Sequence, residues 1–245
     1  MHVLALDTTT RDGSVALVDG DRIIDERRGD PSRSHAERLP GDLVALADEH
    51  GIRLNAIDLF AVASGPGSFT GLRIGIATIQ GLALTTGRRV VAVSALEALA
   101  QRGSSKAAAG TLVAAWMDAH RREVFSALYA IADAPLFSPD RLVEIEGPTA
   151  GDPHTTLTRW ADRIGHADVF FVGDGAVQYA ETIERRASPG WRIVAPPVLA
   201  GAIGRIAVAR DTIDPAGVYP LYVRRPDAEL AREKKSVHHN GHEGH

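Results

Sequence analysis

The stretch with the clearest chemical potential runs from Ser64 to Gly75, with the sequence SGPGSFTGLRIG. A glycine-rich turn between a strand and a helix can cradle a phosphate group, because the first N–H groups of the helix point at the anion. This turn lacks the lysine and the spacing of a P-loop, so phosphate binding is the weakest of its interpretations. Ser68 or Thr70 can instead cap the helix that follows.

Other residue types in the chain could also do chemistry. Asp7 precedes three threonines, and an aspartate in such a place often does no more than cap a turn. His35 and His120 are expected to have surface roles. The histidines at 238, 239, 242 and 245 could bind a transition metal in vitro, although a solvated tail is the simpler interpretation. The chain contains no cysteine, which excludes disulfides and thiolate metal sites.

The composition is that of an ordinary globular protein, with 44% hydrophobic and 24% charged residues in a chain of 245. The net charge is −4 and no basic stripe is visible, which weighs against this chain gripping nucleic acid by itself. The first residues lack the basic and apolar regions of a signal peptide, and no uncharged stretch is long enough to span a bilayer. We therefore expect a cytoplasmic protein.

The elements that position these residues follow from apolar runs and turn signals. In the first half we expect strands at 3–6, 13–18, 22–27, 59–63 and 90–93, and helices from 34, over 68–86 and over 94–101. Ser34 and Glu37 form a capping box, and Pro40 should kink that helix or restart it. In the second half we expect strands at 112–117, 123–130, 141–145, 168–172 and 192–194, and helices over 155–164, 173–186 and 198–209.

Two units of strand–strand–strand–helix–strand–helix indicate a duplicated α/β domain, in which Asp7 and Asp118 occupy equivalent places. The small-residue connector at 103–110 suggests a boundary. We predict an N-terminal domain at 1–104, a smaller C-terminal domain at 105–225 and a disordered His-rich tail at 226–245.

The helix at 68–86 is apolar nearly all round, since only Arg73, Thr78 and Gln80 are polar between Leu72 and Leu84. Such a helix must be covered on two sides, and the sheet can cover only one. Glycines at 67, 71 and 75 permit close approach of another backbone, either within the domain or from a second chain. The second interpretation predicts that Gly75→Arg leaves the chain folded but unable to assemble. Arg73 is expected either to reach a polar group at that contact or to snorkel at the surface.

The duplicated unit resembles the actin, sugar-kinase and Hsp70 ATPases of the ribonuclease H-like fold. In that family an aspartate after the first strand organises a metal–phosphate complex, and a Gly-x-Gly turn backs the adenosine. The resemblance implies a vestigial nucleotide site at Asp7, Thr8, Thr9, Gly173, Asp174 and Gly175. The long side chains of 118–122 would crowd a phosphate, so at most weak ATP or ADP binding, in the cleft or at a subunit interface, is expected.

Six segments together resemble a more specific family, TsaB. They are LDTT at 6–9, SHAERL at 34–39, SGPGSFTGLRIG at 64–75, VSALEAL at 93–99, MDAHRREV at 117–124 and GDGA at 173–176. TsaB proteins are the dimerisation subunits of the bacterial machinery that installs threonylcarbamoyl on adenosine 37 of tRNAs reading ANN codons. The resemblance implies a heterodimer with the paralogous transferase TsaD, the ATPase TsaE as a further partner, a homodimer when alone, and only indirect contact with tRNA.

The same resemblance implies that the helices beginning near Ser34 and Ser68 build the contact with TsaD. The implied partner-binding residues are Ser34, His35, Arg38, Leu39, Leu43, Ser68, Phe69, Thr70, Gly71, Arg73, Gly75, Thr78 and Leu82. TsaD carries a metal-binding histidine pair where this chain has Ala95 and Leu99, so no metal and no catalytic residue are expected. Two enzyme hypotheses stay open beside the scaffold: a small-molecule kinase or ATPase, and a glycoprotease-type peptidase.

Overall fold

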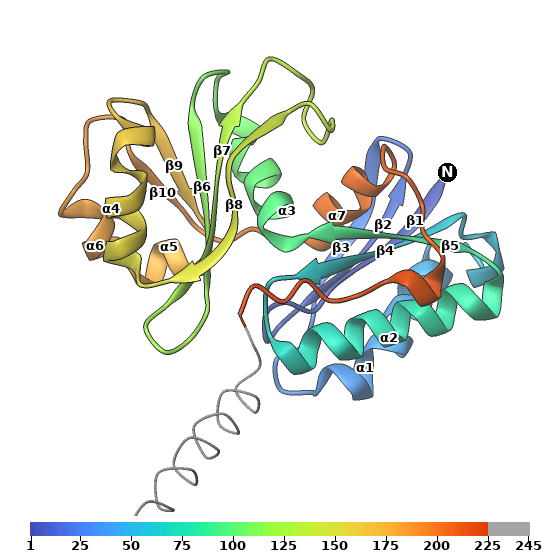
Figure 1. Ribbon diagram of the computed structural model, residues 1–245. Coiled ribbons are helices and arrows are strands. Elements are labelled where there is room, and N and C mark those ends of the chain that lie inside the picture. Colours follow the sequence, from blue (N-terminus) through green and yellow to red (C-terminus); the bar gives the residue numbers. More distant parts are fainter. Residues whose placement is uncertain (225–245) are drawn as a thin grey trace, which may run out of the picture.

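The computed structural model describes residues 1–224, and the tail predicted at 226–245 lies outside the described residues. A five-stranded sheet with the order β3-β2-β1-β4-β5 occupies the first half (Figure 1). Its strands are β1 (His2–Asp7), β2 (Ser14–Asp19), β3 (Arg22–Arg28), β4 (Leu59–Gly65) and β5 (Arg89–Ser94). The first three strands form an antiparallel meander, and β4 and β5 continue the sheet in parallel with β1.

The second sheet repeats this connectivity, with the order β10-β9-β6-β7-β8. Its strands are β6 (Leu112–Asp118), β7 (Val124–Ile131), β8 (Leu142–Gly151), β9 (Val169–Val172) and β10 (Arg192–Val194). β6, β7 and β8 are antiparallel neighbours, whereas β9 and β10 extend the sheet in parallel with β6. The predicted duplicated actin-like, ribonuclease H-like fold is confirmed.

Helices and sheets alternate in five layers (Figure 1). One face of the first sheet carries α1 (His35–Glu49) and α2 (Phe69–Thr86), and the other carries α3 (Ala95–Gly103) and α7 (Ala200–Ala207). The outer face of the second sheet is covered by α4 (Pro153–Ile164), α5 (Asp174–Gln178) and α6 (Ala180–Glu184). Short 3-10 turns occur at Leu54–Ala56, Ser104–Lys106 and Pro215–Gly217. Within residues 1–224 no helix combines the length and apolarity needed to cross a membrane.

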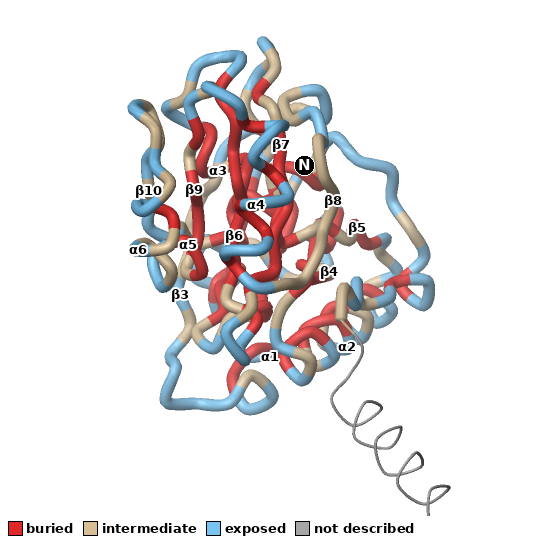
Figure 2. Tube along the Cα trace, turned by 60° about the vertical axis from the view of Figure 1, so that its left-hand side comes forward, coloured by how far each residue is buried: buried red, intermediate tan, exposed pale blue. Residues whose placement is uncertain are grey.

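Alternation along the strands sorts the side chains between these layers. In β1, Leu4 and Leu6 pack beneath α1 and α2, whereas Val3 and Ala5 face α3 and α7. The inner core continues into β6 and β7 through α3, which packs against both sheets, whereas α7 packs against the first sheet and α3. Figure 2 shows that the central strands of both sheets are buried along most of their length.

After α7 the chain returns to the first sheet as residues 213–224, which we call the C-terminal strap. The strap lies beside α2 (Figure 1) and is held by backbone and side-chain hydrogen bonds from Val90 to Ile213, from Gln80 to Pro215 and Val218, and from Leu221 to Ser64. The predicted division at residue 104 separates the two sheets, but α7 and the strap pack against the first sheet although they follow the second in sequence.

Most of the helices begin and end near the predicted residues. The Glu37 carboxylate accepts a hydrogen bond from the backbone N–H of Ser34, as a capping box requires, and a second one from the Ser34 hydroxyl. Of the two predicted outcomes at Pro40, a kink or a restart, the restart is wrong, because α1 continues through this residue as one helix. The single helix predicted over 173–186 is also wrong, because α5 and α6 are separate helices that meet at Tyr179.

Candidate functional site

The outer face of α2 is open to solvent. Exposed residues recur at Thr70, Arg73, Ala77, Gly81 and Leu84, at the three- and four-residue spacing of one helix face. Leu84 is 64% exposed, and a Cβ placed on Gly81 would meet no atom within 4 Å. Since α1 lies along one flank of α2 and the strap along the other, this face is the side of the apolar helix that the chain leaves uncovered.

Gly71 and Gly75 of α2, and Gly67 just before the helix, do not belong to this open face. A Cβ on Gly71 would lie 2.3 Å from the carbonyl oxygen of Thr8, and one on Gly75 would lie 2.2 Å from the Thr8 hydroxyl oxygen. Gly67 faces Thr9 in the same way, at 2.7 Å from its carbonyl oxygen. The close approach that these glycines permit is therefore internal, and the interpretation as a notch for a second chain is wrong. Gly75→Arg would damage the fold and cannot serve as a clean test of assembly.

Three further residues expected to bind a partner are buried inside the chain. Arg38 is only 2% exposed: its guanidinium contacts the carbonyl oxygen of Asp12 and the Nδ1 of His35, and its Nη1 lies 2.8 Å from Asp42. Leu39 and Leu43 are fully buried beneath the first sheet. The correction has a simple cause, because a helix at the surface turns half of its residues inward.

The remaining predicted partner residues are accessible. Ser34, Ser68, Thr70 and Arg73 are exposed, and His35, Phe69, Thr78 and Leu82 are half-buried. The hydroxyl of Thr78 donates to the carbonyl oxygen of Ile74 within the same helix, so Thr78 offers mainly its methyl group.

Arg73 reaches a polar group of its own chain. Its Nε donates to the hydroxyl of Tyr222 at 3.0 Å, and its guanidinium carbon lies 4.0 Å from the ring centroid of Phe69. The rings of Phe69 and Tyr222 stack at 5.2 Å, so the strap caps the first turn of α2. Sequence analysis missed Tyr222; the aromatic and apolar run at 218–223 is the signal that could have drawn attention to it.

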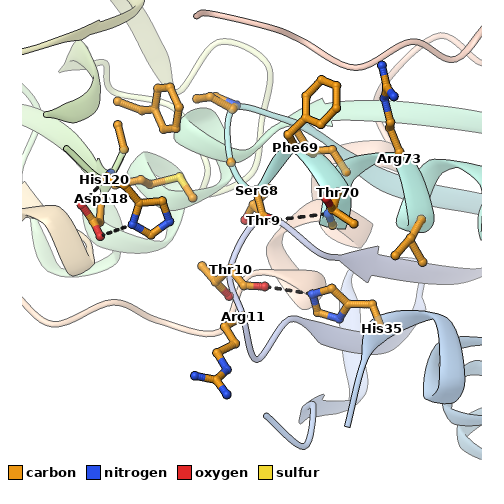
Figure 3. Close-up of a pocket in the computed structure, with 18 of the residues that line it drawn as sticks. Thr9, Thr10, Arg11, His35, Ser68, Phe69, Thr70, Arg73, Asp118 and His120 are labelled. Carbon is orange, nitrogen blue, oxygen red and sulfur yellow. Dashed lines mark hydrogen bonds and ion pairs between the residues drawn. The ribbon is translucent and has the colours of Figure 1, made fainter. Parts of the chain in front are cut away.

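A cleft of about 1120 Å³ opens beside this cluster, between the first turns of α1 and α2 and the end of β6. Figure 3 shows Asp118 and His120 on one side, with Thr9, Ser68 and Thr70 opposite. The Nδ1 of His120 lies 3.1 Å from the Asp118 carboxylate, and the Nε2 of His35 lies 3.1 Å from the carbonyl oxygen of Thr10.

The predicted nucleotide residues lie together at the base of this region. Asp7, Gly173 and Asp174 line a smaller cavity of about 270 Å³, closed on one side by residues 196–199. Asp7 is buried and accepts hydrogen bonds from the backbone N–H of Thr9 at 2.9 Å and its hydroxyl at 2.6 Å. Burial raises the pKa of the Asp7 carboxyl, although these hydrogen bonds oppose the rise. These hydrogen bonds mean that Asp7 caps the turn at Thr9, which is the simpler of the two roles considered in the sequence analysis.

The Gly-x-Gly turn is likewise occupied by its own chain. Gly173 has φ +123°, and a Cβ there would lie 2.0 Å from the carbonyl oxygen of Trp116; Gly175 is packed closely against Met117. The Asp174 carboxylate accepts hydrogen bonds from the backbone N–H groups of Asp118 and Gly175. These glycines are explained by close packing against β6, and nucleotide binding stays a prediction.

Ala95 and Leu99 lie on α3 directly after β5, where the transferase is expected to carry its histidines. Both are buried in the core shared by the two sheets, and neither side chain has an atom that ligates a metal. Across residues 1–224 no three histidine, aspartate or glutamate side chains come together as a metal site.

Comparison with known proteins places this arrangement in a family. A family model described as TsaD, tRNA N6-adenosine threonylcarbamoyltransferase, matches residues 30–211. The chain is 38% identical over 129 residues to the tRNA threonylcarbamoyladenosine biosynthesis protein TsaB of Escherichia coli, covering 53% of this chain and 55% of that protein. It is 32% identical over 235 residues to an uncharacterized protein of Mycobacterium tuberculosis, covering 93% of both.

A solved structure agrees with these matches. YeaZ from Pseudomonas aeruginosa superposes with a TM-score of 0.73 at 31% identity, covering 90% of this chain and 99% of that one. The chain spans about half the length of several curated relatives, 56% of a Mycobacterium leprae protein and 55% of E. coli TsaB. The fold and these matches define a duplicated α/β protein related to proteins of tRNA threonylcarbamoyladenosine biosynthesis. The chain belongs to the TsaD family, and within it to the TsaB proteins.

Proposed function

We propose that the chain is a non-catalytic scaffold subunit that binds the transferase TsaD through the outer face of α2 and the exposed edge of α1. Together with TsaE, the pair would carry out threonylcarbamoylation of adenosine 37 in tRNAs reading ANN codons, in the cytoplasm. The observation that carries the proposal is the open apolar side of α2, where Ala77, Gly81 and Leu84 face solvent. Burying such a face between two chains removes apolar area from water at about 25 cal/mol per Å².

The absence of a catalytic role is part of the proposal. With Ala95 and Leu99 in place of a histidine pair, this chain would leave metal binding to its partner. When the partner is missing, we expect the same face to be buried in a symmetric homodimer, since an isologous contact is the commonest way to cover such a surface.

Nucleotide binding by this chain would be weak and without turnover. We propose the cavity beside Asp7 and Asp174 as the site of this weak ATP or ADP binding, because three of the residues predicted to bind nucleotide line it. The Oδ1 of the Asp7 carboxylate already accepts two hydrogen bonds from Thr9, which leaves mainly the other oxygen for a metal–phosphate complex. Steady hydrolysis of ATP by the purified chain would instead favour the kinase or ATPase hypothesis.

The proposal is tested with Ala77→Arg, which places a long charged side chain in the middle of the open face. Ala161→Arg on α4 is the matched control, because Ala161 is also an exposed helical alanine but faces away from α2. We expect Ala77→Arg to keep its circular dichroism spectrum and to lose capture of TsaD, while Ala161→Arg captures TsaD normally. Equal capture by the two variants would contradict the proposed surface.

A further inference from the structure

The cleft beside α2 combines two kinds of side chain that recur in nucleic-acid sites, guanidinium groups and aromatic rings. Four arginines and three aromatic residues line it: Arg11, Arg33, Arg73, Arg224, Phe69, Phe125 and Tyr222. Thr9, Thr10, Ser68 and Thr70 line the same cleft (Figure 3). These residues come from segments far apart in the sequence, so the combination arises only in the folded chain.

The residues that line the cleft have a positive net charge, although the chain as a whole has a net charge of −4. Only two carboxylates line the cleft, and both are engaged: Asp118 by His120, and Asp174 by two backbone N–H groups. Arg224 pairs with Glu123 at 2.7 Å, whereas Arg11 and Arg33 are exposed and form no ion pair with another residue of the range 1–224. The residues that line the cleft therefore carry an excess of positive charge, which favours an anionic ligand.

The aromatic residues make a phosphodiester chain a better fit than an isolated anion. Phe69 and Tyr222 are already stacked on each other, and Tyr222 keeps 41% of its surface exposed beside the arginines. Unpaired bases stack on such rings while arginines hold the phosphates between them. The cleft volume of about 1120 Å³ exceeds the roughly 300–1,000 Å³ of a small-molecule pocket, so it has room for more than one nucleotide.

A strained turn lies at the edge of the cleft. Three consecutive residues, His120, Arg121 and Arg122, all have a positive φ between 54 and 65 degrees. Side chains other than glycine rarely adopt this left-handed region. Such strain costs about 1–3 kcal/mol for each residue and clusters at functional sites. The turn forms the tip of the β6–β7 hairpin, and its first residue, His120, lines the cleft.

We propose that this cleft binds a short single-stranded segment of RNA directly, with Arg11 and Arg33 on phosphates and Tyr222 beneath a base. The proposal rests on the proposed function, which makes tRNA the substrate of the assembly. It replaces the expectation, implied by the TsaB resemblance, that the chain contacts tRNA only indirectly. The net charge of −4 also weighed against nucleic-acid binding, but an average over the whole chain does not report a local cluster.

The test is fluorescence anisotropy of a fluorescein-labelled RNA hairpin with a single-stranded loop, titrated with the full chain at several salt concentrations. We expect a dissociation constant of about 10⁻⁶–10⁻⁴ M. The double variant Arg11→Ala/Arg33→Ala should lower the slope of log affinity against log salt by about 1.4, which is about 0.7 for each lost phosphate contact. Tyr222→Ala should weaken binding about tenfold. Arg22→Ala/Arg185→Ala, which removes two exposed arginines away from the cleft, should change neither quantity.

Capture of TsaD by the same variants separates this inference from the proposed function. Normal capture with reduced RNA binding supports a cleft that serves RNA. The inference is overturned if the unaltered chain does not bind the hairpin, or if the cleft and control variants bind it equally. It is also overturned if the arginine variant loses TsaD and keeps RNA, because the cleft would then receive an acidic protein surface.

Discussion

Gly75→Ala gives the sharpest test of how α2 packs inside the chain. The added Cβ would lie 2.2 Å from the Oγ1 and 2.9 Å from the Cγ2 of Thr8, which is fully buried and has little room to move. Overpacking of this kind costs about 1–3 kcal/mol. Replacing a helical glycine by alanine returns about 0.5–1 kcal/mol, so we expect a net loss of about 1–2 kcal/mol in the free energy of unfolding.

Gly81→Ala is the matched control on the same helix. A Cβ at position 81 meets nothing within 4 Å, so only the gain in helix propensity remains. This variant should be more stable than the unaltered chain by about 0.5–1 kcal/mol. The same chemical change, six residues apart, should therefore shift stability in opposite directions.

Combining Gly75→Ala with Thr8→Ala tests whether Thr8 is the source of the clash. Thr8→Ala removes the Oγ1 and Cγ2 atoms, and the Thr8 Cβ that remains lies 3.1 Å from the new methyl group at position 75. The Thr8 hydroxyl has no hydrogen-bond partner among residues 1–224, so its loss alone should cost little. Urea unfolding of the single and double variants should give a coupling energy of about 1–2 kcal/mol. If Gly75→Ala is as stable as Gly81→Ala, or if Thr8→Ala does not rescue it, the internal contact is not what these glycines serve.

Two further substitutions test the base of the cleft. Burial raises the native pKa of Asp7 above its ordinary value of 3.8. The stability that this shift contributes is therefore present below that value and is lost as pH rises through the native pKa. Asp7→Asn should raise the unfolding free energy near neutral pH and lose this advantage in acid, as urea titrations over pH would show; a constant difference would mean that ionisation is not involved. Gly173→Ala clashes with Trp116, so it should cost about 4 kcal/mol and lower the melting temperature by about 8–16 °C. A much smaller shift would contradict the packing argument.

Local patterns were sufficient to predict most of the fold. The alternation in residues 3–6, the Ser34–Glu37 capping box and the apolar run at 112–117 each depend on near neighbours in sequence, so they predicted elements that the structure contains. The duplicated order of strands then predicted the actin-like topology. For the same reason the placement of Ala95 and Leu99 on the helix after β5 was predictable.

The site was less predictable because it depends on contacts between distant segments. No local signal indicates that the glycines at 71 and 75 face Thr8, more than sixty residues earlier, or that the strap returns after α7 to cap Phe69 with Tyr222. Arg38 illustrates the same limit: the TsaB resemblance implied a partner-binding role, but three acceptors from the β1–β2 loop and from α1 itself hold it in the interior. The corrected surface is therefore smaller and lies on the opposite side of α2 from the glycines.

The central claim is that TsaD covers the outer face of α2, and the absence of cysteine allows it to be measured directly. Ala77→Cys would introduce the only thiol in the chain, on the open face, and Ala161→Cys would do the same on α4. We predict that adding TsaD slows maleimide labelling at position 77 strongly and leaves labelling at position 161 unchanged. Labelling at position 77 that stays fast in a complex shown to be intact would contradict the account.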